Sequence, residues 1–364
     1  MINDMFKFLK QFKIMKASNS QIDKAGKMLS QSPSNNEAFA LVNDWRSLHS
    51  LPLARLRTNI YQYFAKERKK ANIITQRLKR IPTIINKISR MGTMKVSQMQ
   101  DIGGLRVIVN DIGEVYALHR KLDKTRSDFS FTKKNEIDYI KNPKTRDKKG
   151  GCAYRSLHIV YVFHSDSKDY DNLKIELQIR TKKQHYWATA VEVIDIIEKQ
   201  SIKFGMGNAD WSDFFAITSS LFALQEAMPT FEEHRAHDKN TLLLKFCELE
   251  NKIGVINKLK GISSIQTIGK FAKSTSYALI ILDTITNTTN ITEYKEKDVS
   301  HAYEAYSKTE QKILNENSSQ IALLASASEF KKLKEGYLAY FLDVQEFIKE
   351  LESLKNEFTS LQSS

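Results

Sequence analysis

The chain has 364 residues, of which 41% are hydrophobic and 10% aromatic, enough apolar side chain for a folded core in about two domains. It holds two cysteines, Cys152 and Cys247, and no run of ~18 apolar residues, so we expect neither a disulfide scaffold nor a membrane span. The first 16 residues are amphipathic and basic but lack the apolar region of a signal peptide. These features predict a soluble, cytoplasmic protein.

The net charge of +14 is confined to one part of the chain. Residues 1–238 contain 40 Lys and Arg against 26 Asp and Glu, whereas residues 239–364 contain 16 of each sign. A strongly basic region is typical of proteins that bind phosphate-rich partners, either nucleotides or RNA. The alternative is that the charge serves solubility alone.

The N-terminal region is predicted to be helical. Apolar residues recur with helical spacing over 20–30 and 37–48, and a basic helical stretch is expected over 52–90. A further helix is expected over 115–122.

Three segments further along the chain are predicted to be strands. Residues 173–180 alternate strictly between apolar and polar side chains, which is typical of a half-buried strand. Asp101 precedes a Gly-Gly turn and a short β-branched run, and a third strand begins at Leu157. Three strands of one sheet would gather a set of polar side chains on one surface: Asp101, Tyr154, Arg155, His158, Glu176 and Arg180. Two carboxylates among several cations suit a Mg²⁺–triphosphate site.

These segments also resemble a known family. The run DIGGLRVIV, DYIKNPK, YRSLH, IELQIRT and HYWA, within residues 77–188, resembles the synthetase domain of RelA/SpoT proteins. The resemblance implies an α+β fold, a nucleotidyltransferase-like mixed sheet flanked by helices. It also implies a pyrophosphokinase, which transfers a pyrophosphate group from ATP to a ribose 3′-hydroxyl.

The resemblance assigns roles to individual residues. It implies that Asp101 holds Mg²⁺, that Glu176 either helps to hold the metal or acts as base, and that Tyr154 stacks on the acceptor base. The residues expected to bind ATP phosphates or to hold the polar face are Arg46, Arg77, Lys79, Arg106, His158 and Arg180. Arg46 has the alternative of a capped helix end, and His158 that of a core histidine.

The loop before Tyr154 departs from the family pattern. It carries extra residues, and Ala153 replaces a glycine. Its added cations would suit a large polyanionic acceptor. We therefore predict contacts with tRNA from Lys144, Arg146, Lys148, Lys149 and Arg155.

A helix over 182–199, one ending at Glu226 and a helical connector over 229–262 are expected to follow. The last part of the chain has a separate α+β pattern. Strands are expected over 277–282, 289–294 and 320–325, with helices over 299–314, 329–337 and 344–358. This part resembles the antitoxin-like pseudo-zinc-finger domain of fused toxin–antitoxin proteins called CapRel, without its cysteines, so no zinc is expected. The resemblance implies that Tyr337 and Tyr340 cover the nucleotide pocket. We predict a toxin domain over 1–238 and a regulatory domain over 239–364.

Three functions follow from these patterns. The first is a toxin that transfers pyrophosphate from ATP to the 3′ end of tRNA and so stops translation. In the proteins that the chain resembles, a phage structural (capsid-type) protein releases the restraint, which implies an antiviral defence system. The second is a synthetase of (p)ppGpp or (p)ppApp from free nucleotides. The third is an RNA-binding module whose catalytic site is inactive.

Overall fold

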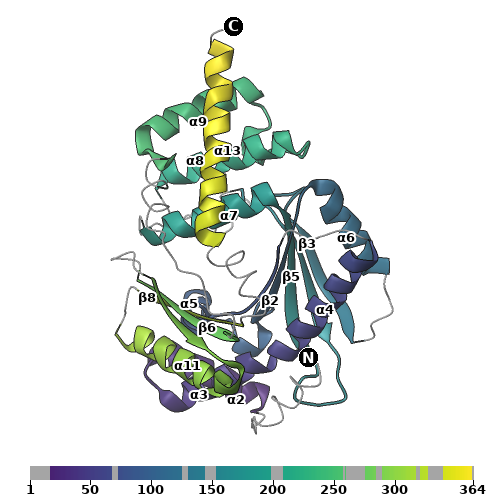
Figure 1. Cartoon of the computed structure of the whole chain (residues 1–364), viewed down its shortest axis with the longest axis vertical. Helices are drawn as coiled ribbons and strands as arrows, with labels where there is room; N and C mark the ends of the chain where they lie inside the picture. Colours follow the sequence, from purple (N-terminus) through teal and green to yellow (C-terminus); the bar gives the residue numbers. More distant parts are fainter. Residues whose placement is uncertain are drawn as a thin grey trace.

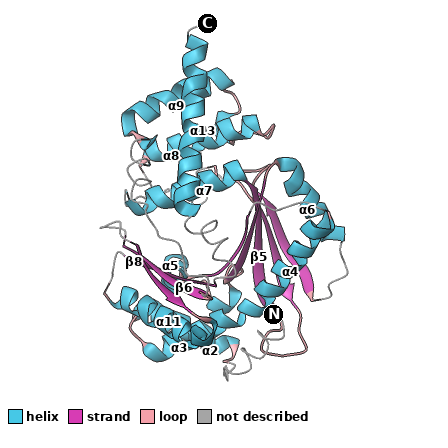
Figure 2. Ribbon diagram, viewed as in Figure 1, coloured by secondary structure: helices cyan, strands magenta, loops and turns pink. Residues whose placement is uncertain are grey.

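The structure is a computed structural model. It describes residues 17–67, 73–124, 130–143, 153–197, 208–256, 259, 275–283, 289–316, 320–326 and 339–362. Its central feature is a five-stranded sheet with strand order β1-β2-β5-β4-β3 (Figures 1 and 2). The strands are β1 (Ile73–Leu78), β2 (Gly103–Val109), β3 (Phe131–Asp138), β4 (Leu157–Phe163) and β5 (Leu173–Thr181). β2 and β5 are parallel and the other pairs are antiparallel, so the sheet is mixed, as predicted.

Alternation on β5 gives the sheet its two faces. Leu173, Ile175, Leu177 and Ile179 are buried, whereas Lys174, Glu176 and Gln178 are partly exposed. Gly103, the first residue of β2, leaves little room for a side chain, because a Cβ there would lie 2.7 Å from Cδ1 of Ile175 and 3.2 Å from Cβ of His49.

Two strands correct the prediction. β1 lies inside the stretch expected to be helical, because residues 73–78 pair antiparallel with β2 and bury Ile74. β3 was not predicted, because most of its residues are exposed and its strand conformation comes from pairing with β4.

Helices cover the apolar face of the sheet. α4 (Ser50–Lys66) and α6 (Ile112–Lys124) contribute Leu53, Ile60 and Val115 to the core beneath the sheet. In Figure 1 both helices lie on the same side of the strands. The opposite, polar face is thereby left to carry the candidate site.

A second core joins helices from distant parts of the chain. It is formed by α7 (Lys182–Ile197), α8 (Ala209–Gln225), α9 (Lys239–Ile253) and α13 (Ala339–Gln362). α8 and α9 are joined through the short 3-10 helix η3 (Glu232–His234), and the predicted connector is helical over α9. Among the described residues, no helix is both long and apolar enough to cross a membrane.

The remaining elements form a third group. α2 (Asn19–Gln31), α3 (Asn36–Leu48), α5 (Ile81–Met91) and η1 (Val96–Gln98) share one apolar core. Beside them lies a three-stranded sheet, with strand order β7-β6-β8, and α11 (Figure 1). These elements are β6 (Tyr277–Asp283), β7 (Thr289–Tyr294), η4 (Glu296–Asp298), α11 (Val299–Asn315) and β8 (Gln320–Ser326).

The C-terminal strand predictions agree with β6, β7 and β8. The helix expected over 329–337 lies outside the described residues, and the last helix starts earlier than expected, at Ala339. α9 and α13 share their core with α7 and α8. The domain division at residue 238 and the pseudo-zinc-finger assignment stay predictions.

Candidate active site

The polar face of the five-stranded sheet collects side chains from four strands. Cross-strand pairing places Arg77 of β1 opposite Gly104 of β2, and Gly104 opposite Glu176 of β5. One step along, Arg106 of β2 is paired with Gln178 of β5, which is paired with His158 of β4. Directly paired residues point to the same face of a sheet, so these side chains share one surface.

Asp101 lies just before β2 between two lysines. Lys79 Nζ donates to Asp101 Oδ2 at 2.7 Å, and Lys87 Nζ donates to Oδ1 at 3.1 Å. Partial burial alone would raise the pKa of Asp101, but the two ammonium groups outweigh it and lower the pKa to about 2. The carboxylate is therefore ionised at neutral pH.

Glu176 belongs to a closed ring of hydrogen-bonded side chains, which we call the Glu176 ring. Glu176 Oε1 is 3.1 Å from His158 Nδ1, and His158 Nε2 is 2.9 Å from the Tyr154 hydroxyl. Arg180 Nη2 donates to the Tyr154 hydroxyl and to Gln178 Oε1, each at 2.7 Å. Gln178 Nε2 donates to Glu176 Oε2 at 2.7 Å and closes the ring. Both carboxylate oxygens of Glu176 are thus fixed in position.

The Glu176 ring also sets the protonation states of its members. Burial favours the neutral form of Glu176, but the hydrogen bond and charge of His158 outweigh it, so the pKa of Glu176 lies below its ordinary value. Burial would lower the pKa of His158, yet Tyr154 and Glu176 raise it to about 9. Burial would raise the pKa of Tyr154, but Arg180 and His158 lower it to about 7. The ring therefore favours an ionised Glu176 beside a protonated imidazole.

The two carboxylates fit a divalent cation by their donor chemistry. Both offer oxygen ligands, which Mg²⁺ prefers, and both are partly exposed, at 23% for Asp101 and 18% for Glu176. Although the pKa of Glu176 is lowered overall, the charge of Asp101 acts against this lowering, so the two groups lie within electrostatic reach of each other. A shared cation would relieve this repulsion.

Arg155 does not belong to this surface, which corrects the prediction of a tRNA contact. Its side chain is 3% exposed, and the guanidinium donates to the carbonyl oxygens of Ile140 and Pro229 and to the Ser219 hydroxyl. These bonds tie the loop before β4 to α8, so Arg155 has a structural role. The other predicted tRNA contacts, Lys144, Arg146, Lys148 and Lys149, lie outside the described residues.

The Arg46 side chain contacts the C-terminal segments. Arg46 Nη1 forms an ion pair of 2.8 Å with Glu310 of α11, and its guanidinium lies over the Tyr306 ring. Arg46 is 3% exposed and Glu310 is 2% exposed. In this conformation Arg46 has no access to a phosphate, so the predicted phosphate contact is not formed here.

Of the two predicted covering residues, only Tyr340 belongs to α13. Tyr337 lies outside the described residues, and of Tyr340 only the backbone is described. Within the next turn of α13, Asp343 Oδ2 approaches His185 Nε2 of α7 to 2.7 Å, and both side chains are buried. Arg106 and Arg180 are close enough to contribute to lowering the pKa of His185, after burial as the main cause. The contact between His185 and Asp343 therefore lies within electrostatic reach of the cations of the polar face.

Two side chains that bond to the carboxylates of the site were not predicted to do so from the sequence. Gln178 bridges Arg180 and Glu176, and Lys87 forms the second ion pair of Asp101. The alternation of β5 already placed Gln178 on the same face as Glu176. It could not specify which polar side chains of that face bond to each other.

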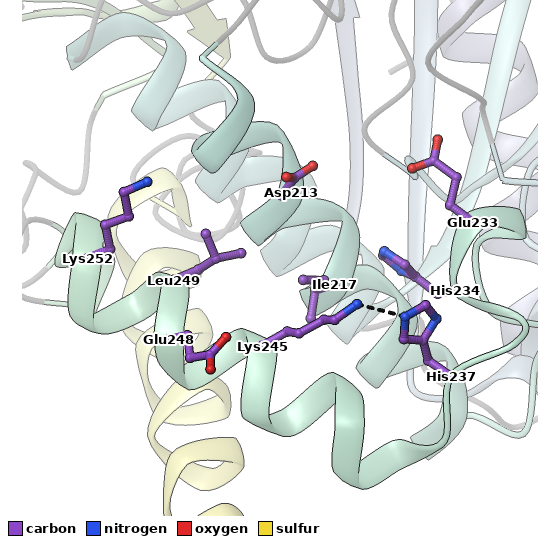
Figure 3. Close-up of a pocket in the computed structure, with 9 residues that line it drawn as sticks. All are labelled: Asp213, Ile217, Glu233, His234, His237, Lys245, Glu248, Leu249 and Lys252. Carbon is purple, nitrogen blue, oxygen red and sulfur yellow. Dashed lines mark hydrogen bonds between the residues drawn. The ribbon is translucent and has the colours of Figure 1, made fainter.

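Two other features lie away from this surface. Figure 3 shows a cavity of about 510 Å³ between α8, η3 and α9, lined by Asp213, Ile217, Glu233, His234, His237, Lys245, Glu248, Leu249 and Lys252. It holds none of the predicted site residues. On the opposite face of the sheet, His119, Asp123 and Glu136 lie together, but Lys133 Nζ already sits within 2.9 Å of both carboxylates.

A mixed sheet with two carboxylates among arginine and lysine side chains is suited to the transfer of phosphate groups from a nucleotide. Residues 76–195 match the sequence model of a family described as the region found in RelA and SpoT proteins. The chain therefore contains a RelA/SpoT-type synthetase domain, and this domain is a pyrophosphokinase. Asp101, Tyr154, His158, Glu176 and Arg180 all fall inside the matched residues. No curated protein matches the chain.

Several solved structures are similar to part of the chain. Small alarmone synthetase 1 from Bacillus subtilis, bound to its product pppGpp, is 21% identical, with a TM-score of 0.41, over 49% of this chain and 89% of that protein. Small alarmone synthetase 2 from Bacillus subtilis is 21% identical, with a TM-score of 0.42, over 50% and 92%. A GTP pyrophosphokinase family protein from Streptococcus pneumoniae is 23% identical, with a TM-score of 0.38, over 49% and 86%.

Proposed function

We propose that the protein transfers the pyrophosphate group of ATP to the 3′-hydroxyl of tRNA and so blocks translation. In this reaction the hydroxyl oxygen forms a bond to the β-phosphorus. The bond from that phosphorus to the oxygen bridging to the α-phosphate breaks, and AMP leaves with that oxygen. The hydroxyl proton passes to Glu176.

The Glu176 ring is the observation that carries this proposal. A carboxylate held at both oxygens and kept ionised is oriented to accept a proton from a bound hydroxyl. Arg77, Lys79 and Arg106 lie on the same surface and would neutralise the phosphates. Mg²⁺, held by Asp101 and Glu176, would supply charge neutralisation for the triphosphate when bound.

The proposed acceptor follows from charge. Residues 1–238 carry the whole net charge of +14, more than a free nucleotide requires. A basic first domain is what a long polyanion would need for binding. Transfer to GDP, GTP or AMP, the alarmone synthetase activity, is the competing outcome.

The C-terminal segments would lower this activity without abolishing it. Glu310 of α11 neutralises and buries Arg46, which was expected to serve the phosphates. Asp343 of α13 meets His185, whose pKa is affected by the charges of Arg106 and Arg180, and Tyr337 and Tyr340 precede Asp343 by six and three residues in the sequence. A phage structural protein that binds the C-terminal segments would free both regions, and the protein would then act in antiviral defence.

An assay with γ-labelled ATP tests the transfer. Wild-type protein should place label on whole tRNA and release AMP, and Asp101→Asn should place none. Label on GDP, GTP or AMP, with none on tRNA, would contradict the tRNA proposal and favour the alarmone activity. Phage capsid-type proteins added one at a time should raise the rate if one of them is the trigger.

Growth of expressing cells tests the restraint. Tyr337→Ala should slow growth without phage, and adding Asp101→Asn should restore it. Normal growth of the Tyr337→Ala variant, with wild-type protein levels, would contradict the restraint.

A further inference from the structure

Three side chains of metal-ligand type lie together on the apolar face of the five-stranded sheet, away from the candidate active site. His119 and Asp123 are one turn apart on α6, so they share one side of that helix. Glu136 belongs to β3, where it is paired with the core residue Ile159 and so points to the face that α6 covers. The three side chains are 18%, 38% and 28% exposed, in that order, so an ion can reach them from solvent.

The spacing of their nitrogen and oxygen atoms is close to that of a metal-ligand shell. His119 Nε2 lies 2.9 Å from Glu136 Oε2 and 3.2 Å from Asp123 Oδ2, and all three ligand atoms lie within 4.8 Å of one another. A tetrahedral Zn²⁺ ion with bonds of about 2.1 Å holds neighbouring ligand atoms ~3.4 Å apart. Small changes in side-chain torsion would therefore place one imidazole nitrogen and two carboxylate oxygens around such an ion and leave the fourth position to water.

Lys133 already places a cation between the same two carboxylates. Its Nζ lies 2.6 Å from Asp123 Oδ1 and 2.9 Å from Glu136 Oε2. Lys133 and Glu136 are three residues apart, so in a regular strand they would point to opposite faces. The register of β3 shifts between Lys133 and Asn135, and this bulge brings both side chains to one face. Because the Lys133 side chain is 40% exposed, its ammonium can move into solvent when another cation binds.

We propose that His119, Asp123 and Glu136 bind a divalent transition-metal ion of the Zn²⁺ class, and that the Lys133 ammonium neutralises the site when no ion is bound. The imidazole favours a transition metal over Mg²⁺ or Ca²⁺, which prefer oxygen ligands alone. The ion would tie α6 to β3, which is an edge strand of the sheet, and so stabilise the folded state. This site is separate from the C-terminal segments, where the missing cysteines predict no zinc.

Calorimetric titration of the full chain with Zn²⁺ tests the site. Excess Mg²⁺ is present throughout, so that sites made of carboxylates alone are occupied. Wild-type protein should bind Zn²⁺, and His119→Ala and Glu136→Gln should each weaken binding at least about tenfold, since even changes outside the ligand shell cost ~10–100-fold in metal affinity. Zn²⁺ should also raise the thermal unfolding midpoint of wild-type protein and leave that of His119→Ala unchanged.

Two further variants keep the test decisive. Lys133→Met removes the ammonium that competes with the ion and should tighten Zn²⁺ binding about tenfold. It changes an exposed side chain, so it should fold even if His119→Ala does not. His164→Ala is the matched control, because His164 Nδ1 lies 3.7 Å from Asp171 Oδ1 in an exposed pair that belongs to no three-ligand cluster of the described residues. It should bind Zn²⁺ as wild-type protein does.

Equal Zn²⁺ affinity in wild-type protein, His119→Ala and Glu136→Gln would overturn the inference. So would the absence of binding by wild-type protein, even if Lys133→Met binds Zn²⁺, because Lys133 would then be the natural occupant of the site. Binding is measured without ATP or an acceptor, so the result does not depend on the proposed function.

Discussion

The charged groups on the polar face of the sheet differ from those between the C-terminal helices and the rest of the chain. Asp101 and Glu176 keep about a fifth of their surface in solvent, whereas Arg46 and Glu310 are almost fully buried. Partly exposed charges with several partners can exchange those partners for a ligand. Removing one member of a buried ion pair is strongly destabilising, because the remaining charge stays buried without a partner or solvent. The first region should therefore respond to substitution in activity, and the second in stability.

The largest expected effect is on the polar face. Glu176→Gln keeps the shape of the side chain and removes its charge and basicity, so the transfer rate should fall by ~10²–10⁴-fold. The thermal unfolding midpoint should stay close to that of wild type.

Lys174→Gln is the matched control, two residues earlier on the same strand face, and should keep its activity. A Glu176→Gln enzyme with more than a tenth of wild-type activity would show that the Glu176 ring does not serve the reaction.

The buried pair should show the opposite response. Glu310→Ala leaves the guanidinium of Arg46 buried without its carboxylate, and the free energy of unfolding should fall by about 3–5 kcal/mol. Denaturant unfolding followed by fluorescence measures this loss. Glu304→Ala on the same helix, α11, removes an exposed partner of Lys308 and should leave the unfolding curve unchanged. If Glu310→Ala and Glu304→Ala gave the same unfolding curve, the buried pair would not respond in stability as expected, and the difference between the two regions would be wrong.

A smaller effect is expected from the buried imidazole of His49, which is 1% exposed. Burial lowers the pKa of His49 from its ordinary value to about 4. The unfolded chain then binds more protons between pH 6.5 and 4, so the free energy of unfolding should fall as the pH falls through this window, by at most ~3 kcal/mol. Above pH 6.5 this contribution does not change with pH.

His49→Gln tests the assignment, since glutamine can still donate to the Trp45 carbonyl that His49 Nδ1 meets at 2.9 Å, but does not titrate. Unfolding curves at pH 7 and 4.5 should show a smaller pH dependence for this variant. Identical pH dependence in both proteins would show that His49 does not contribute.

The parts of the fold that could be predicted from the sequence are those with a signal in neighbouring residues, and the parts that could not are defined by residues distant in the chain. The alternation of residues 173–180 is a local signal, and it identified β5, its two faces and the position of Glu176. β1 and β3 carry weaker local signals, because their strand conformation depends on partners 19 to 35 residues away in the chain.

The misplaced arginines show the same limit. Arg155 stands beside Tyr154 in a motif, but its partner Ser219 is 64 residues away, so its burial could not be seen in the sequence. Arg46 and Glu310 are 264 residues apart. Residue types predicted which groups could meet phosphate, and only the packing of α8 and α11 decided which of them remained accessible.

The most direct measurement is transfer of label from γ-labelled ATP to whole tRNA by wild-type protein and by Asp101→Asn. We predict that wild-type protein labels tRNA, releases one AMP for each group transferred, and loses this activity in the variant. Equal labelling by both proteins, or no labelled acceptor of any kind with wild-type protein, would contradict a reaction that depends on Asp101 and Glu176 together.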